Sequence, residues 1–216
     1  MNRLRILAGF EKARHRYEEA VDLMKVHLRY LIRERGLMHA SEAEQRVTGR
    51  VKSAESVLRK LRRIERRQRI RVTTWADAER VLNDIAGIRV VCNYLDELLL
   101  VYGYLRKQPA FRELQARFED YVRHPKVGYR GLHSVFRIRT TFGEARCEVQ
   151  IRTALQDAWA VKSHALVYKL KKTELQQLPA QVKNLLINQS DQLYTIDRAF
   201  KEIASLIARY LRGSTR

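Results

Sequence analysis

"GLHSVFRIRTTFGEARCEVQIRT", residues 131–153, predicts a β-hairpin. Two runs with β-branched and aromatic residues flank the letters TFGE, in which Gly143 suits a tight turn. Because strand side chains alternate between the two faces of a sheet, each run separates into an apolar and a polar set. The apolar set is Leu132, Phe136, Ile138, Ala145, Cys147, Val149 and Ile151, and the polar set is His133, Arg137, Arg139, Arg146, Glu148, Gln150 and Arg152. The hairpin therefore has one core face and one polar face, which could carry a functional site or simply face solvent.

The rest of the chain reads as helices that alternate with short strands. Apolar residues at three- and four-residue steps predict a helix over 3–35, and Ser53 is a candidate N-cap for a helix over 53–68. We also expect strands at 45–51 and 87–94, helices at 96–107, 154–172 and 180–212, and helical or irregular structure at 111–123. This order predicts one α/β (α+β) domain over 1–216, with a core at 45–172 and helical flanks at 1–36 and 178–212.

The net charge of the chain is strongly positive, because 43 Lys and Arg residues face 24 Asp and Glu residues, which gives +19. Such an excess indicates an anionic partner: a nucleotide, a nucleic acid, the ribosome, an acidic protein or a membrane surface. The densest run is RKLRRIERRQRIR at 59–71, with eight cations and one acid. On its own, this run is also typical of a solvated basic helix.

Export signals and disulfides are not expected. No apolar run reaches the roughly 20 residues of a membrane span, and the charged N-terminal stretch lacks the apolar segment of a signal peptide. The only cysteines, Cys92 and Cys147, lie in apolar runs without a CxxC pattern, which indicates two buried, reduced thiols. We therefore expect a cytoplasmic protein without a membrane partner.

Two carboxylates could form a metal site. Asp84 stands just before the strand expected at 87–94, and Glu148 lies on the polar face of the hairpin. Acidic groups on neighbouring strands of a cationic protein could hold Mg²⁺, which takes few carboxylates and shares its shell with substrate phosphates.

A row of phosphate-binding side chains accompanies these carboxylates. Lys52, Ser56, Lys60 and Arg63 follow one another at steps of four, four and three residues, so they share one face of the 53–68 helix. The row begins at the helix N-terminus, where backbone N–H groups also favour anions.

Five motifs in order resemble the RelA/SpoT synthetase domain, and specifically the single-domain small alarmone synthetases: GRVKSAESVLRKL, DIAGIRVVC, PKVGYRGLH, EVQIRT and DAWAVKSHALVYK. The resemblance covers roughly residues 5–205. It implies a nucleotidyltransferase-like mixed β-sheet flanked by helices. It also implies Mg²⁺-dependent transfer of the β,γ-pyrophosphate of ATP to a ribose 3′-hydroxyl.

On the donor side, Asp84 resembles the Mg²⁺-binding aspartate of the family, and Glu148 resembles the glutamate that holds the metal or activates the 3′-hydroxyl. Arg50 and Arg89 resemble the pair that sandwich adenine. The residues that resemble contacts to the phosphates of ATP are Lys52, Ser56 and Lys60.

On the acceptor side, the resemblance implies that Tyr129 stacks on the acceptor base, which is worth roughly 1–3 kcal/mol for a base on an aromatic ring. Lys126 and Arg130 could meet the acceptor phosphates, and His164 resembles the family histidine near the acceptor. We assign three residues of the polar strand face to substrate binding as well: His133, Gln150 and Arg152.

Three departures from the family pattern lie on the acceptor side. Val127 replaces an asparagine, Gly131 replaces a serine, and Ser163 replaces an acidic residue. The acceptor therefore stays open. GDP or GTP would give (p)ppGpp, an adenine nucleotide would give (p)ppApp, and the 3′-CCA end of tRNA would make the protein a translation-blocking toxin paired with an antitoxin.

The remaining alternative is a catalytically inactive RNA-binding protein that keeps the fold. The resemblance also implies a homo-oligomer, dimer or tetramer, built by the helical flanks. Because no hydrolase signature accompanies the synthetase motifs, we expect synthesis without hydrolysis.

Overall fold

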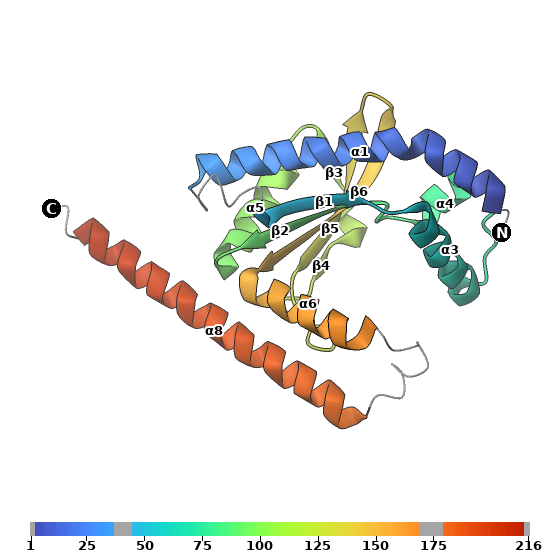
Figure 1. Ribbon diagram of the computed structural model, residues 1–216. Helices are drawn as coiled ribbons and strands as arrows, with labels where there is room; N and C mark the ends of the chain where they lie inside the picture. Colours follow the sequence, from blue (N-terminus) through green and yellow to red (C-terminus); the bar gives the residue numbers. More distant parts are fainter. Residues whose placement is uncertain (1–2, 37–44, 169–178, 214–216) are drawn as a thin grey trace. The chain divides into compact units, whose positions relative to one another are not determined.

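The computed structural model describes residues 3–36, 45–168 and 179–213 (Figure 1). The helices in these ranges are α1 (Arg3–Glu34), α3 (Ala54–Gln68), α4 (Trp75–Val81), α5 (Leu95–Lys107), the short 3-10 helix η1 (Gln115–Arg117), α6 (Ala154–Tyr168) and α8 (Ala180–Gly213). The strands are β1 (Val47–Val51), β2 (Ala86–Cys92), β3 (Phe111–Glu113), β4 (Glu119–Asp120), β5 (Leu132–Thr140) and β6 (Gly143–Thr153). The end of the helix expected at 154–172 lies outside the described residues from 169 onward.

The strands form one sheet in the order β1-β2-β6-β5-β3, and β4 pairs with β5. β1 runs antiparallel to β2, with Val47 opposite Val90 and Val51 opposite Ala86, and β3 runs antiparallel to β5. The predicted hairpin forms β5 and β6, and its apolar set on β6 is buried: Ala145, Cys147, Val149 and Ile151. The expected α/β class, a mixed sheet flanked by helices, is confirmed.

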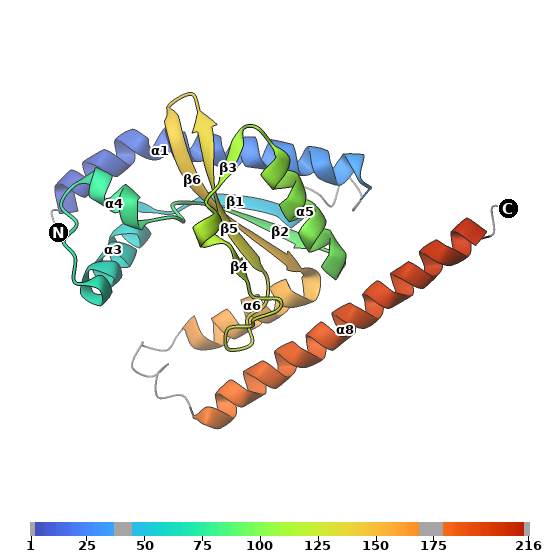
Figure 2. The same cartoon turned by 180° about the vertical axis from the view of Figure 1, so that it is seen from behind.

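Two compact units make up the chain, and each is assembled from separate segments. The first comprises Met1–Val90, Gly103–Phe118 and His133–Gln150. In it, α1 lies along β1 in both views (Figure 1 and Figure 2). The predicted apolar stripe of α1 is buried, including Phe10, whose ring meets the edge of the Trp75 ring of α4 at 5.4 Å between centroids.

The second unit comprises Val91–Tyr102, Glu119–Leu132 and Ile151–Arg216. Helices α6 and α8 lie side by side in it (Figure 1 and Figure 2). The indole Nε1 of Trp159 on α6 donates a hydrogen bond of 3.1 Å to the carbonyl oxygen of Leu186 on α8. The single-domain boundaries expected from the sequence stay a prediction.

Two short regions differ from expectation. Segment 111–123 was expected to be helical or irregular, but it contains β3, η1 and β4. Strands of three and two residues are too short to show an alternating pattern, and only their pairing with β5 defines them. The seven residues of α4 are likewise too few for a periodic signal; the capping box between Thr74 and Asp77 marks its start.

Both cysteines are buried thiols that form no disulfide within the described residues, as expected. Burial raises the pKa of the Cys147 thiol, so this group stays protonated at neutral pH. Among the described residues, no helix combines the length and the apolar character that crossing a membrane requires.

Candidate active site

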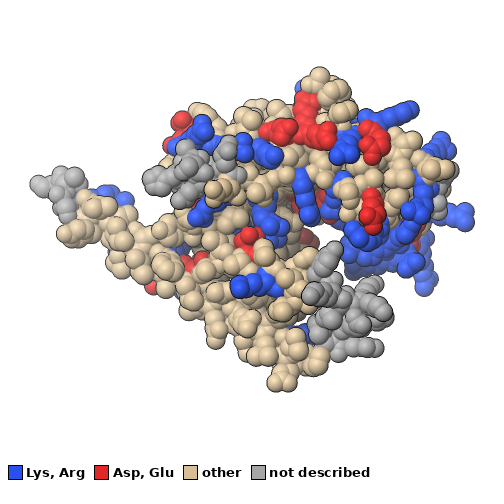
Figure 3. All heavy atoms as spheres, viewed as in Figure 1, with Lys and Arg blue, Asp and Glu red and all other residues tan. Residues whose placement is uncertain are grey.

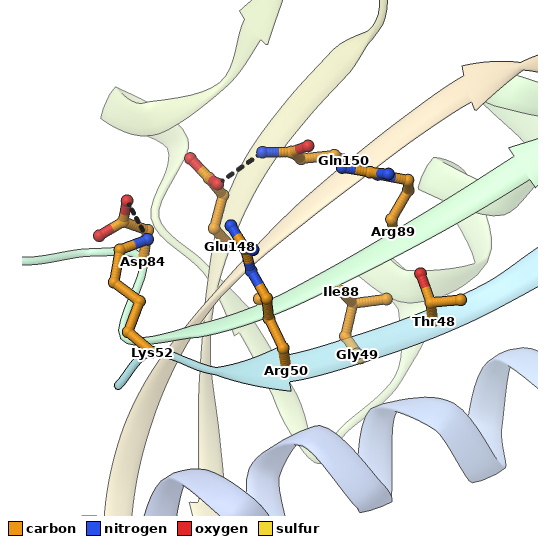
Figure 4. A pocket seen from close by; sticks show the side chains of 10 residues that line it. Thr48, Gly49, Arg50, Lys52, Asp84, Ile88, Arg89, Glu148 and Gln150 are labelled. Atoms are coloured by element: carbon orange, nitrogen blue, oxygen red, sulfur yellow. Dashed lines mark hydrogen bonds and ion pairs between the residues drawn. The ribbon is translucent and has the colours of Figure 1, made fainter. Parts of the chain in front are cut away.

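A pocket in the first unit opens on the polar face of the sheet (Figure 4). Gly49 faces α1, where an added Cβ would lie 2.6 Å from Cγ1 of Val21. The neighbouring side chain of Arg50 therefore stands on the opposite face of β1, together with those of Glu148 and Gln150 from β6. Six of the predicted site residues line this pocket: Arg50, Lys52, Asp84, Arg89, Glu148 and Gln150.

Asp84 lies between α4 and β2 and is held by two lysines. Its Oδ2 atom forms an ion pair of 3.0 Å with Nζ of Lys52 and a second one with Nζ of Lys60. Burial alone would raise the pKa of Asp84, but the hydrogen bond from Lys60 and the charge of Lys52 together lower it. A backbone hydrogen bond of 2.8 Å from Lys52 to Ile85 joins the end of β1 to this segment.

The second oxygen of Asp84 is the open position of this cluster. Its Oδ1 atom is buried and has no hydrogen-bond partner among the described residues. Since a buried carboxylate oxygen without a partner is costly, this atom is suited to a cation.

Glu148 has the opposite electrostatic environment. Burial raises the pKa of its carboxyl group, the hydrogen bond from Gln150 lowers it, and the nearby charge of Asp84 raises it again. The Nε2 atom of Gln150 donates to Oε2 of Glu148 at 2.8 Å, and Nδ1 of His133 lies 3.9 Å from Oε1. Two carboxyl groups whose pKa values are pushed apart are a common arrangement of acid and base groups at active sites.

The two pocket arginines come from neighbouring strands. Arg50 is opposite Gly87 in the β1–β2 ladder, and Arg89 is opposite Thr48, so the two arginines are diagonal neighbours. Such neighbours are roughly 7–8 Å apart, within reach of long side chains. Gly87 carries no side chain, and a Cβ there would meet only the carbonyl oxygen of Glu148, at 3.9 Å. The floor between the arginines therefore stays open.

The donor set suits a magnesium ion that shares its shell with a substrate. No group of three or more His, Cys, Asp or Glu side chains gathers as a metal site in the part of the chain that the structure describes. Asp84 and Glu148 nevertheless line one pocket, and Oδ1 of Asp84 is open. One or two carboxylates completed by phosphate oxygens and water are the usual Mg²⁺ site.

Ser56 is not one of the residues that line the pocket. Its hydroxyl accepts a hydrogen bond of 3.0 Å from Arg59, and it bonds Ser53 at the start of α3, where Ser53 is the N-cap as predicted. Of the residues predicted to share one face of this helix, Lys60 reaches the pocket cluster, where it pairs with Asp84. The role of Ser56 stays a prediction.

The second unit contains the loop at 124–131 that carries Tyr129. Lys126 and Tyr129 exchange two backbone hydrogen bonds of 3.1 and 3.0 Å across Val127 and Gly128. Both central residues have positive φ, 50° and 82°, as a type I′ turn requires. Asparagine followed by glycine is the favoured sequence of this turn, so Val127 is a strained substitute for the asparagine of the family pattern.

The ring of Tyr129 is held by an arginine. Nε of Arg152 donates to the Tyr129 hydroxyl at 2.8 Å, and the guanidinium carbon lies 4.8 Å from the ring centroid. Asp157 accepts from Nη1 of Arg152 at 3.1 Å, and the ring of Tyr121 meets that of Tyr129 at 78°. Gly131 makes room for this arrangement, because a Cβ there would lie 3.0 Å from Cγ of Arg152.

The other predicted acceptor residues differ in their surroundings. Arg130 donates to the carbonyl oxygen of Val122 at 2.6 Å and to Asp191 at 2.7 Å, so its guanidinium already has protein partners. Lys126 and His164 are exposed. Acceptor-phosphate contacts by Arg130 and Lys126 stay predictions.

Comparison with known proteins shows the family of the chain. The profile of the region found in RelA / SpoT proteins matches residues 49–173. The chain belongs to the RelA/SpoT family. Two relatives from Bacillus subtilis are the GTP pyrophosphokinases YwaC, 30% identical over 77% of this chain and 79% of the relative, and YjbM, 31% identical over 87% and 84%.

Solved structures of small alarmone synthetases also match. Small alarmone synthetase 1 from Bacillus subtilis bound to its product pppGpp has a TM-score of 0.70 and 30% identity, and covers 92% of this chain and 98% of the other. The same synthetase bound to AMPCPP has a TM-score of 0.60 and 26% identity, with 89% and 94% covered.

All the site residues predicted from the sequence lie within the RelA/SpoT region, residues 49–173. Residues with no such prediction also take part: Thr48 and Gly87 line the pocket, and Tyr121 and Asp157 hold the Tyr129–Arg152 pair. Gly87 had a signal, because it lies in DIAGIRVVC, one of the five motifs. Asp157 had the same kind of signal, because it is the first residue of the motif DAWAVKSHALVYK, whereas Tyr121 had none, since only the folded chain brings it to Tyr129.

Proposed function

We propose that this protein is an ATP-dependent pyrophosphotransferase that transfers the β,γ-pyrophosphate of ATP to the 3′-hydroxyl of GDP or GTP and forms (p)ppGpp. The observation that carries the proposal is one pocket with two carboxyl groups of opposite pKa shift, Asp84 and Glu148, beside Lys52. The names of the relatives, GTP pyrophosphokinases and a synthetase with bound pppGpp, support guanine nucleotides as acceptors.

On the donor side, Arg50 and Arg89 would bracket the adenine ring, because they extend as diagonal neighbours over the open floor at Gly87. Lys52 and Lys60 would contribute positive charge to the phosphates while they keep Asp84 ionised. Mg²⁺, when bound by Oδ1 of Asp84, would neutralise phosphate charge and orient the phosphates of ATP.

Glu148 is the proposed general base. Its raised pKa makes the carboxylate a better proton acceptor than an ordinary glutamate, and Gln150 fixes its orientation. As the proton of the 3′-hydroxyl passes to Glu148, the 3′-oxygen bonds to the β-phosphorus of ATP. The bond from the β-phosphorus to the bridging α,β-oxygen then breaks, and AMP leaves. Positioning and electrostatics supply most of the catalysis in such phosphoryl chemistry.

The test is a transfer assay with ATP labelled at the γ-phosphate, with and without Mg²⁺, and with GDP, GTP, ADP and deacylated tRNA offered in parallel. Label is expected on GDP or GTP. Glu148→Gln should abolish transfer, whereas Glu144→Gln, which alters an exposed carboxylate at the other end of β6, should not. Label on ADP or tRNA alone, or no label at all, would overturn the proposal.

A second acceptor, the 3′ end of tRNA, is favoured by the charge of α3. Six arginines in its second half and just beyond it are exposed and have no hydrogen bond or ion pair within the described parts of the chain: Arg62, Arg63, Arg66, Arg67, Arg69 and Arg71. In Figure 3, blue spheres gather on the side where Figure 1 draws α3. An extended cationic surface suits a nucleic-acid backbone better than a small nucleotide.

The tRNA candidate predicts steep salt dependence. Arg66→Gln with Arg67→Gln should weaken tRNA binding and reduce the slope of log K against log salt by about one for each arginine that contacts a phosphate. Arg198→Gln with Arg209→Gln on α8 is the charge-matched control. An equal effect of both pairs of substitutions would contradict the proposal that α3 binds tRNA. Transfer of label to tRNA would also imply a cognate antitoxin.

A homodimer or homotetramer is proposed from the exposed apolar side chains of α8. Phe200, Ile203, Ile207 and Tyr210 are between 49% and 75% exposed and follow one another at steps of three and four residues. Light scattering coupled to size exclusion measures the mass directly, and a monomer at micromolar concentration would contradict this proposal.

A further inference from the structure

Helix α8 is bonded to the loop at 124–131 on both sides of Tyr129. The hydroxyl of Ser190 donates a hydrogen bond to the carbonyl oxygen of Gly128, and the carboxylate of Asp191 accepts one of 2.7 Å from Nη2 of Arg130. All of these residues belong to the second unit. The residues immediately before and after Tyr129 are thus both tied to one turn of α8.

The contact of Ser190 is buried, whereas that of Asp191 is partly open to solvent. Ser190 is 3% exposed, the side chain of Arg130 is 10% exposed, and that of Asp191 is 53% exposed. The guanidinium of Arg130 also lies 4.2 Å from the centroid of the Tyr194 ring, one turn further along α8. The buried hydrogen bond of Ser190 restricts the loop more than a solvent-exposed one does, because water replaces it less easily, whereas the bond of Asp191 is strengthened by charge.

The turn itself is seated against the two helices. A Cβ at Gly128 would lie 2.7 Å from Cζ2 of Trp159 on α6 and 3.0 Å from the carbonyl oxygen of Leu186 on α8. The loop therefore has no space to shift toward either helix, so the positions of α6 and α8 determine the position of its backbone.

The partner of Tyr129 is anchored to the same helix. Arg152, which contacts the ring, is followed by Thr153, whose hydroxyl donates at 2.6 Å to the buried carboxylate of Asp197 on α8. Both members of the Tyr129–Arg152 pair thus have a chain neighbour that is bonded to α8.

We propose that α8 sets the geometry of the acceptor site, with Ser190 and Asp191 as positioning residues that fix the plane of the Tyr129 ring. The inference rests on the proposed function, in which that ring receives the acceptor base. Since α8 lies beyond residues 49–173, this role falls outside the RelA/SpoT region itself.

The test compares two variants with matched controls on the same helix. Asp191→Asn removes the charge that holds Arg130. Its control is Glu202→Gln, which also replaces a carboxylate of α8 by an amide, but at a residue that has no hydrogen bond or ion pair within the described chain. Ser190→Ala removes the hydroxyl that holds Gly128, and Ser205→Ala removes one that bonds only within α8.

Initial rates give KM for GDP at saturating ATP and KM for ATP at saturating GDP. Asp191→Asn and Ser190→Ala should raise KM for GDP about tenfold, the worth of one charge-assisted or buried hydrogen bond, and leave KM for ATP unchanged. The controls should leave both constants unchanged. A lower Tm with both KM values unchanged, or an equal rise in the two, would assign these residues a merely structural role and overturn the proposal.

Amide hydrogen exchange supplies a readout that needs no acceptor. The N–H of Tyr129 is bonded to Lys126 in the turn, so its exchange reports whether the turn is held. Faster exchange at 126–131 in Asp191→Asn but not in Glu202→Gln supports the proposal even if the wild type transfers to no guanine nucleotide, an outcome that would refute only the proposed function. Unchanged exchange would contradict the inference.

Discussion

Replacing Gly131 with alanine should destabilise the protein and disturb the Tyr129–Arg152 pair. Gly131 has a φ of +150°, a conformation that residues with a side chain rarely adopt. An added Cβ would lie 3.0 Å from Cγ of Arg152 and 3.2 Å from the carbonyl oxygen of Ile151. The backbone oxygen cannot move aside easily, so Arg152 must give way or the turn must strain.

The expected magnitude follows from these two terms. A residue held in a sparsely populated backbone region costs about 1–3 kcal/mol. Crowding by one methyl group adds about 1 kcal/mol, the low end for overpacking, because the Arg152 stem is flexible. For a chain of this size, a total of about 2–4 kcal/mol lowers Tm by roughly 5–15 °C.

Thermal unfolding followed by circular dichroism measures this change, with Gly103→Ala as the control. Gly103 lies inside α5, and a Cβ there would meet nothing within 4 Å, so this alanine should stabilise by about 0.5–1 kcal/mol. Gly131→Ser, which introduces the residue of the family pattern, should fare no better than Gly131→Ala. Equal stability of Gly131→Ala and the wild type would refute the reasoning from φ and packing.

Three further predictions concern the turn and the carboxylates. Val127→Asn should stabilise by about 0.5–1 kcal/mol in urea unfolding, because asparagine tolerates the positive φ of the first turn position, and no gain would argue against the I′ turn. Gln150→Ala removes the donor that lowers the pKa of Glu148, so this pKa should rise further and the acid limb of kcat/KM should move to higher pH; an unmoved limb would exclude Glu148 as the base. Asp84→Asn should reduce kcat at least about hundredfold in a folded protein, as loss of a key electrostatic group does, and near-normal turnover would contradict the proposed metal site.

The sequence predicted the pocket of the first unit well, because the placement of its side chains depends on local patterns. The alternation in the hairpin placed Glu148 and Gln150 on one polar face, and the steps along the 53–68 helix placed Lys60 with Lys52. Ser56 fitted the same steps, but its hydroxyl is used at the start of the helix. Spacing identifies the face of a helix, and it does not show how far each side chain reaches.

The loop of the second unit that carries Tyr129 was less predictable, because its geometry depends on contacts between distant residues. Arg130 matched a phosphate-binding role, yet Asp191, 61 residues further along the chain, is its ion-pair partner. Likewise, no pattern within the 124–133 stretch indicates that Arg152 contacts Tyr129. The same limit explains why β3 and β4, which only pairing with β5 defines, carried no signal of their own.

The two lysines on one oxygen of Asp84 would limit which ion the proposed metal site accepts. Because Lys52 and Lys60 both occupy Oδ2, only Oδ1 is open, and the carboxylate can offer a cation a single oxygen. Calcium typically gathers six to eight oxygen ligands and often takes both oxygens of a carboxylate, whereas the smaller magnesium ion accepts single oxygens in an octahedron completed by phosphates and water. If the proposed metal site forms, the lysine pair would therefore favour magnesium over a cation that takes both oxygens of the carboxylate.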